Sequence, residues 1–235
     1  MTFRAKSLAM NLIVKICGLS SEETLDAALE AGADMVGLVF FPPSPRFVGL
    51  DRAAGLASRA RGRAEIVALT VDMDDTGLQA VVAAVRPDWL QFHGKETPER
   101  LAQAKESFKI KVMKAIGIRD RSDLAAVARY RAADRLLLDA KPPKGAMLPG
   151  GNGAPFDWTI LKGFDAGLPY LLSGGLDPGN VGEALRVTQA SGVDVSSGIE
   201  TAPGRKDPDL IRAFVAAARA AYSTIEARQP ERAAS

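Results

Sequence analysis

Two side chains combine a type and a position that point to proton transfer. Cys17, the only cysteine, ends the apolar run Ile13–Cys17, and alternate residues of a strand share a face, so Lys15 lies on the same face. A nearby ammonium group favours the thiolate, the form of cysteine that accepts a proton. Asp139 follows three consecutive leucines, where burial would favour the protonated carboxyl group, which can donate. We therefore predict a base and an acid at these positions, although an isolated cysteine is by default a small buried hydrophobic residue.

Glycines and hydroxyl groups form a second candidate group, after two apolar runs in the C-terminal half. They lie in Ser173-Gly174-Gly175 and in Ser196-Ser197-Gly198. Backbone amides without bulky side chains can approach an anion closely, and a short helix starting at Ser197 would point its amide end at a phosphate. Gly174 and Gly175 alone would equally suit a simple turn. The pairing of the two motifs favours a phosphate site at Gly174, Gly175, Ser197 and Gly198.

Three further features carry weaker predictions. Arg46 ends the proline-rich segment 42–46, and the stiff chain lowers the entropy lost when a guanidinium group binds a carboxylate or phosphate. The alternative is an ordinary solvated arginine. His93 is interpreted as a wall of the pocket, because a single histidine at a strand end is more often structural than catalytic. The segment Ala140–Pro155, with glycines at both sides of Asn152, is predicted to form a mobile lid.

Eight apolar runs, each followed by a connecting segment, would position these groups. Short runs rich in Val, Ile and Leu without strict alternation are typical of parallel strands buried on both faces, and segments of helical period indicate βαβ units. The predicted strands are Ile13–Cys17, Met35–Phe40, Ile66–Val71, Trp89–His93, Lys111–Ile116, Arg135–Asp139, Tyr170–Ser173 and Val193–Ser196. The predicted helices include Glu22–Ala31, Gly77–Val85, Pro98–Lys105, Asp123–Tyr130, Val181–Val187 and Asp209–Ala221.

Aspartates near the starts of alternate strands support this count. Asp34, Asp88, Asp134 and Asp194 are each expected in a tight helix-to-strand turn, where the side chain binds local backbone amides. Eight such units without a linker match a closed, single-domain α/β fold, the (β/α)₈ TIM barrel, better than an open sheet. In that fold the active site lies where the strands end.

The sequence also predicts the ends of the folded domain. We expect residues 1–11 to be a disordered extension, 12–222 the barrel, and 223–235 a flexible tail. Met10 lies directly before the first predicted strand, so translation could start there.

Composition excludes several classes of function. The 235 residues hold 30 basic and 28 acidic side chains, a net charge of +2, so nucleic acid and anionic membranes are poor partners. No apolar run reaches the ~20 residues that a membrane span requires. One cysteine and one histidine rule out the common zinc sites and favour a reducing, cytoplasmic setting. Dinucleotide-binding and P-loop motifs are absent from the sequence. No predicted helix face carries a large surplus of exposed apolar residues, so the sequence does not decide between a monomer and a homodimer.

Seven motifs follow one another along the chain. They are Val14-Lys15-Ile16-Cys17-Gly18, Pro43-Ser44-Pro45-Arg46, Gln91-Phe92-His93-Gly94, Leu137-Leu138-Asp139, Gly150-Gly151-Asn152-Gly153 with Phe156-Asp157-Trp158, Ser173-Gly174-Gly175-Leu176, and the segment Gly192 to Glu200. In this order they resemble the phosphoribosylanthranilate isomerase family of tryptophan biosynthesis. The resemblance runs from Val14 to about Ala220, with Phe92 and Asn152 as small departures.

The resemblance implies an Amadori rearrangement of N-(5-phosphoribosyl)anthranilate to 1-(2-carboxyphenylamino)-1-deoxyribulose 5-phosphate, without metal or organic cofactor. By that analogy Asp139 is the general acid, Cys17 the general base, and Arg46 the partner of the anthranilate carboxylate. Three alternatives stay open: a flavin oxidoreductase, a related isomerase of histidine biosynthesis, which would carry an aspartate in place of Cys17, and a non-catalytic module that binds a phosphorylated metabolite.

Overall fold

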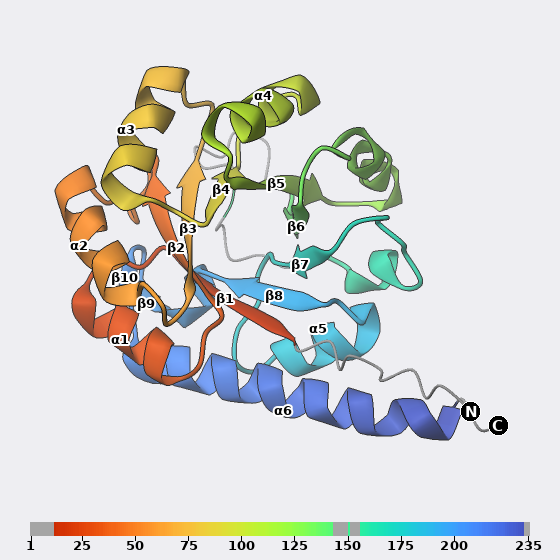
Figure 1. Cartoon of the computed structure of the whole chain (residues 1–235). Coiled ribbons are helices and arrows are strands. Elements are labelled where there is room, and N and C mark those ends of the chain that lie inside the picture. Colours follow the sequence, from red (N-terminus) through yellow and green to blue (C-terminus); the bar gives the residue numbers. More distant parts are fainter. Residues whose placement is uncertain (1–11, 143–149, 151–155, 233–235) are drawn as a thin grey trace, which may run out of the picture.

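The computed structural model, which describes residues 12–142, 150 and 156–232, is a closed barrel of eight parallel strands (Figure 1). Each strand pairs with the next in chain order, and the first pairs with the last, with Ile13 opposite Gly192. The strands are β1 (Ile13–Cys17), β2 (Met35–Phe40), β3 (Glu65–Thr70), β4 (Trp89–Phe92), β5 (Lys111–Ile118), β6 (Arg135–Ala140), β7 (Tyr170–Leu172) and β8 (Gly192–Val195). The predicted (β/α)₈ barrel is confirmed, and strand ends differ from the prediction by one or two residues.

A helix follows every strand and covers the outside of the barrel (Figure 1). Ser21, Asp74 and Thr97 cap three of these helices with their side chains, which accept otherwise unpaired backbone N–H groups. The helices are α1 (Glu22–Glu30), α2 (Leu50–Ala60), α3 (Asp75–Val85), α4 (Pro98–Phe108), η1 (Arg121–Arg129), η2 (Trp158–Leu161), α5 (Val181–Thr188) and α6 (Pro208–Arg232), where η denotes a 3₁₀ helix.

Three segments differ from the sequence-based prediction or lie beyond it. The helix expected over Asp123–Tyr130 forms as the 3₁₀ helix η1, which begins two residues earlier. Helix α6 continues to Arg232, so most of the predicted tail 223–235 has helical backbone, and its flexibility stays a prediction. A short antiparallel hairpin of β9 (Glu200–Ala202) and β10 (Arg205–Lys206), which the prediction did not include, follows β8.

Two predictions fall largely outside the described residues. The extension 1–11 is not described, nor is most of the proposed lid 140–155. Both therefore stay predictions.

Three of the four strand-preceding aspartates bind backbone amides, as expected, but the amides belong to the preceding strand and not to the local turn that was predicted. Asp34, Asp88 and Asp134 each accept a backbone N–H at 2.7–2.9 Å, from the preceding strand in each case. Asp194 is the exception, because β8 begins at Gly192 and places the carboxylate inside the barrel. The prediction of a turn residue was wrong there, and the carboxylate instead belongs to the site described below.

The hydrophobic core has an outer and an inner part. The larger part lies between the strands and the surrounding helices. Inside the barrel, one layer is formed by Met35, Val67, Trp89, Met113, Ala115, Leu137 and Leu171. A second, smaller inner group consists of Cys17, Val39 and Leu69, with Phe41 and Val71 packed on it. The inner part separates the polar strand ends from the opposite end of the barrel.

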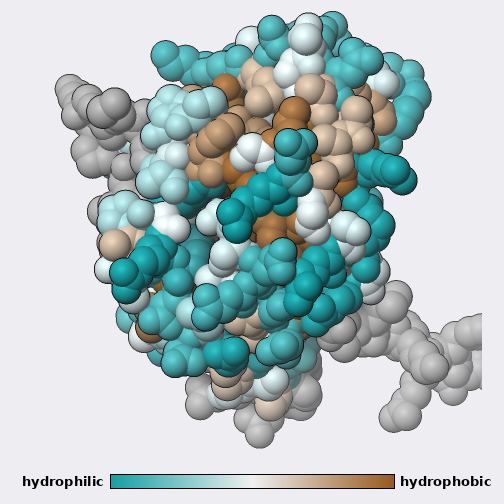
Figure 2. All heavy atoms as spheres, turned by 90° about the vertical axis from the view of Figure 1, so that its left-hand side faces the viewer, coloured by the Kyte–Doolittle hydropathy of each residue, from teal (hydrophilic) through white to brown (hydrophobic). Residues whose placement is uncertain are grey.

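The surface that carries α1, α2 and the β9–β10 hairpin has a mixed character. Figure 2 shows hydrophobic side chains gathered in the upper middle of this face, with hydrophilic side chains around them. The exposed large hydrophobic residues of the described chain are Phe47, between β2 and α2, and Leu50, the first residue of α2. No helix within the described ranges is long and apolar enough to cross a membrane.

Candidate active site

Cys17 ends β1 inside the barrel, above a buried ion pair. Its side chain is buried, and that of Lys15, two residues earlier on the same face, is fully buried. The Lys15 ammonium donates to Asp194 Oδ1 at 2.6 Å, and Ser173 Oγ donates to Asp194 Oδ2 at 3.1 Å. Strands β1, β7 and β8 therefore meet in one polar cluster beneath the thiol.

The pKa of Cys17 is shifted in the direction opposite to the one expected from the sequence, where Lys15 was expected to favour the thiolate. Burial raises the pKa of the Cys17 thiol above its ordinary value, and the charge of Asp194 adds to this, while Lys15 and Lys206 act in the opposite direction. Lysine favours the thiolate, as expected, but desolvation outweighs it. Against the effect of burial, Asp194 and Cys17 raise the pKa of Lys15, which keeps the ammonium group charged.

Asp139 lies near the end of β6 on the same inner side as Leu137 and is buried. Its Oδ2 is 3.2 Å from His93 Nε2, and its Oδ1 accepts the Ala140 N–H at 2.9 Å. His93 directly follows β4, and its Nδ1 lies 3.2 Å from Gln91 Nε2. The histidine interpreted as a wall thus contacts the carboxyl group predicted to be the acid.

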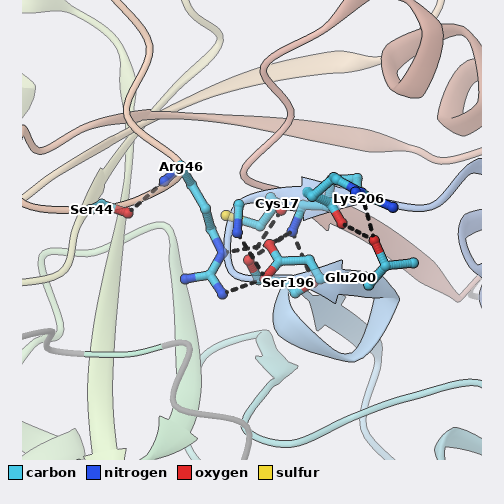
Figure 3. Close-up of polar contacts among 9 residues, drawn as sticks. Cys17, Ser44, Arg46, Ser196, Glu200 and Lys206 are labelled. Carbon is cyan, nitrogen blue, oxygen red and sulfur yellow. Dashed lines mark hydrogen bonds and ion pairs between the residues drawn. The ribbon is translucent and has the colours of Figure 1, made fainter.

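Arg46, in the loop after β2, is held by an ion pair with Glu200 and by packing against Gly18. Its guanidinium group makes a bidentate ion pair with Glu200, with Nε to Oε1 at 2.7 Å and Nη2 to Oε2 at 2.8 Å (Figure 3). Its aliphatic stem crosses Gly18, where an added Cβ would lie 2.7 Å from Arg46 Cδ. Gly18 also has a φ of +79°, so a residue with a side chain would be strained there. The buried Arg46 is therefore fixed beside the end of β1, and the interpretation as a solvated arginine is wrong.

Lys206 connects this ion pair to Cys17. From β10, its ammonium donates to Glu200 Oε1 and to the Ser196 carbonyl oxygen, both at 2.8 Å (Figure 3). Ser196 Oγ donates to the Cys17 carbonyl oxygen at 3.2 Å. Burial lowers the pKa of Lys206 to about 8 despite the opposing effect of Glu200. Against burial, Arg46 and Lys206 lower the pKa of Glu200, so the carboxylate stays ionised between two cations.

The two glycine-containing loops meet beside β7 and β8. Ser197 and Gly198 lie in a short 3₁₀ helix, η3 (Ser197–Ile199), as the sequence predicted. A Cβ on Gly198 would lie 1.9 Å from the carbonyl oxygen of Leu176, the residue after Gly174-Gly175. The two loops therefore touch, and only glycine allows this approach. The backbone N–H groups of Gly174, Gly175, Ser197 and Gly198 make no hydrogen bond to any described residue.

The residues that hold the predicted site residues in place were not identified from the sequence. Glu200 was part of a recognised motif but had no assigned role, and Lys206 was not singled out. The Pro203-Gly204 dipeptide, a common turn signal, could have predicted the hairpin that carries both. Nothing local in the sequence indicates that Asp194 pairs with Lys15. Among the described residues, no three His, Cys, Asp or Glu side chains are grouped as metal ligands would be.

Comparison with known proteins decides the family. The family model for N-(5'-phosphoribosyl)anthranilate isomerase matches residues 14–217. The chain belongs to this family. The isomerase of Afipia carboxidovorans is 63% identical over 92% of both chains, and that of Rhodopseudomonas palustris strain CGA009 is 59% identical over 90% of this chain and all of the relative. The expected resemblance is confirmed, and with it an isomerase of tryptophan biosynthesis.

Solved structures of phosphoribosylanthranilate isomerases share the fold. The Thermotoga maritima enzyme, 33% identical, covers 89% of this chain and 99% of its own, with a TM-score of 0.80. Another structure, with 32% identity, the same coverage and a TM-score of 0.77, contains reduced 1-(o-carboxyphenylamino)-1-deoxyribulose 5-phosphate. The Thermotoga maritima enzyme is described as dimeric and was also crystallised as monomers. For this chain, monomer or homodimer and a cytoplasmic location stay predictions.

Proposed function

We propose that this phosphoribosylanthranilate isomerase works by general acid and base catalysis, with Asp139 and Cys17 at opposite sides of one sugar phosphate. Asp139 protonates the furanose ring oxygen, the C1–O bond breaks, and the substrate nitrogen takes up the positive charge as an iminium ion. Cys17 then removes the proton from C2, and the electron pair of the C–H bond neutralises the iminium to an enolamine. The enolamine tautomerises to the ketone product.

The observation that carries this proposal is the placement of the two groups. Cys17 ends β1 and Asp139 lies near the end of β6, with β7 and β8 between them on one side of the closed barrel. Both side chains are buried on the inner side, at the end where (β/α)₈ enzymes bind substrate. A raised pKa also makes the Cys17 thiolate, once formed, a stronger base for a C–H proton.

The surrounding groups fit the two ends of the substrate. Arg46, which Glu200 holds in place beside the end of β1, would bind the anthranilate carboxylate through its guanidinium group. The backbone amides of Gly174, Gly175, Ser197 and Gly198 would bind the phosphate, which is the common phosphate site of this fold. Because the substrate nitrogen serves as electron sink, the reaction requires no cofactor and no metal. The partner is a small phosphorylated molecule.

Replacement of each catalytic group tests the mechanism. Cys17→Ala and Asp139→Asn should each lower kcat by about 10²–10⁴-fold, the usual contribution of a positioned acid or base. Asp165→Asn, which changes an exposed carboxylate on the β6–β7 connection, is the matched control and should keep full activity. Thermal melting would verify that the variants fold.

Complementation separates an enzyme from a non-catalytic binding module. The wild-type gene should restore growth of a tryptophan auxotroph that lacks this isomerase, and the Asp139→Asn gene should not. Full activity of either catalytic variant in vitro would remove that residue from the mechanism.

A further inference from the structure

Three side chains form a line from the interior of the barrel to the proposed acid. Gln91 in β4 is fully buried, and its Nε2 lies 3.2 Å from His93 Nδ1. His93 Nε2 lies 3.2 Å from Asp139 Oδ2. The two ring nitrogens therefore face two different side chains, and the position of the ring proton decides the direction of both hydrogen bonds.

The Gln91 amide lies among apolar side chains, where burying an apolar residue would cost less free energy than burying an amide. The inner residues of the neighbouring layer are Met, Val, Trp, Ala and Leu. Gln91 Oε1 is buried and has no hydrogen-bond partner among the described residues, which is unfavourable for an amide. The bond from Gln91 Nε2 to His93 is therefore the one polar contact of the amide within the described chain that offsets its burial.

The direction of that bond fixes the histidine. An amide nitrogen only donates, so His93 Nδ1 accepts and carries no proton. A neutral imidazole then carries its proton on Nε2, which donates to Asp139 Oδ2. Because Oδ1 already accepts the Ala140 N–H, both oxygens of Asp139 receive a donor, as the carboxylate left after proton donation requires.

We propose that Gln91 is a positioning residue for the acid: it sets the tautomer of His93 so that Nε2–H stabilises the Asp139 carboxylate formed during the reaction. This inference rests on the proposed function, in which Asp139 donates the proton. Gln91 lies beneath His93 and acts through it.

The chain offers an unusually direct measurement, because His93 is its only histidine. Protein grown with ¹⁵N-labelled histidine gives one pair of imidazole nitrogen signals, free of overlap. We expect the proton on Nε2 and a bare Nδ1 in the ligand-free wild-type protein near neutral pH. A proton on Nδ1 instead, or an even mixture of tautomers, would overturn the proposal without any variant.

Two variants test the role of residue 91. A Gln91→Glu carboxylate accepts but does not donate, so Nδ1 of His93 should gain a proton; an unchanged Nδ1 signal contradicts the proposed contact. Gln91→Met keeps the approximate shape and removes the bond. It should lower kcat by about two- to tenfold, as the loss of one hydrogen bond does, and leave KM within about twofold.

Thr70→Val is the matched control for these variants. Thr70 ends β3, next to β4, is fully buried, and also has an unpartnered polar atom, Oγ1. Its replacement should change neither the histidine signals nor kcat. An equal loss in Thr70→Val and Gln91→Met, or no loss in Gln91→Met, would refute a positioning role. If Asp139→Asn were fully active while the tautomer is as expected, the proposed acid would fail and the Gln91–His93 contact would stand.

Discussion

The buried Lys206 should make the free energy of unfolding depend on pH, and replacing Lys206 should remove that part of the dependence. Its pKa is lowered from 10.5 to about 8 in the folded chain, chiefly by burial. At 1.36 kcal/mol for each pKa unit, the change corresponds to about 3 kcal/mol. This is a large part of the 5–15 kcal/mol that stabilises a typical domain.

The sign follows from proton binding in the two states. Between about pH 8 and 10.5, the ammonium group of Lys206 keeps its proton in the unfolded chain and loses it in the folded one. Stability rises with pH wherever the unfolded state binds more protons. The contribution of Lys206 is therefore fully present above pH 10.5 and is lost as the pH falls through about 8.

Urea unfolding of wild-type protein and of Lys206→Met at several values from pH 7 to 10.5 would measure this. The difference in unfolding free energy between the two proteins should change by about 3 kcal/mol in favour of the wild type as the pH rises. Taking the difference cancels groups common to both, such as Tyr170, whose pKa burial raises to about 12. Lys162→Met, at an exposed lysine, is the control and should run parallel to the wild type. Parallel curves for Lys206→Met as well would refute the assignment to Lys206.

Three further predictions follow from contacts at the strand ends. Asp194→Asn leaves the fully buried Lys15 without its counter-ion and should cost about 3–5 kcal/mol in unfolding free energy, measured by urea denaturation; a loss below about 1 kcal/mol would contradict this. Gly198→Ala should weaken inhibition by a phosphorylated product analogue, because the new Cβ displaces Leu176; an unchanged inhibition constant would remove this loop from the phosphate site. Arg46→Ala should chiefly raise KM in steady-state kinetics, and an unchanged KM would exclude contact with substrate.

The barrel itself was largely predictable from local pattern. The run Met35–Phe40 is buried throughout because parallel strands bury both faces, and Ile13–Cys17 is apolar except at Lys15; the structure places both strands as predicted. Cys17 and Asp139 each come at or near the end of such a run, so their location at the strand ends could be predicted from the sequence.

The contacts that tune these groups were not predictable in the same way. Lys15 was placed correctly on the face of Cys17, but its ion pair with Asp194 joins residues that only barrel closure brings together. Desolvation depends on the whole surroundings of a group, so the raised pKa of Cys17 could not be read from one strand. Likewise, Arg46 and Glu200 are far apart in sequence, and their pairing depends on the hairpin after β8.

The ion pair between Lys15 and Asp194 spans 179 positions of the chain. On the ribosome, the lysine is made with the first barrel strand, and its counter-ion is made only with the eighth. Until then, a nascent barrel of six or seven strands would have to bury an uncompensated ammonium group, which opposes premature compaction around β1. Strand β8 thus completes the wall and supplies the counter-ion in one step, so the charge beneath Cys17 is neutralised only when the barrel closes.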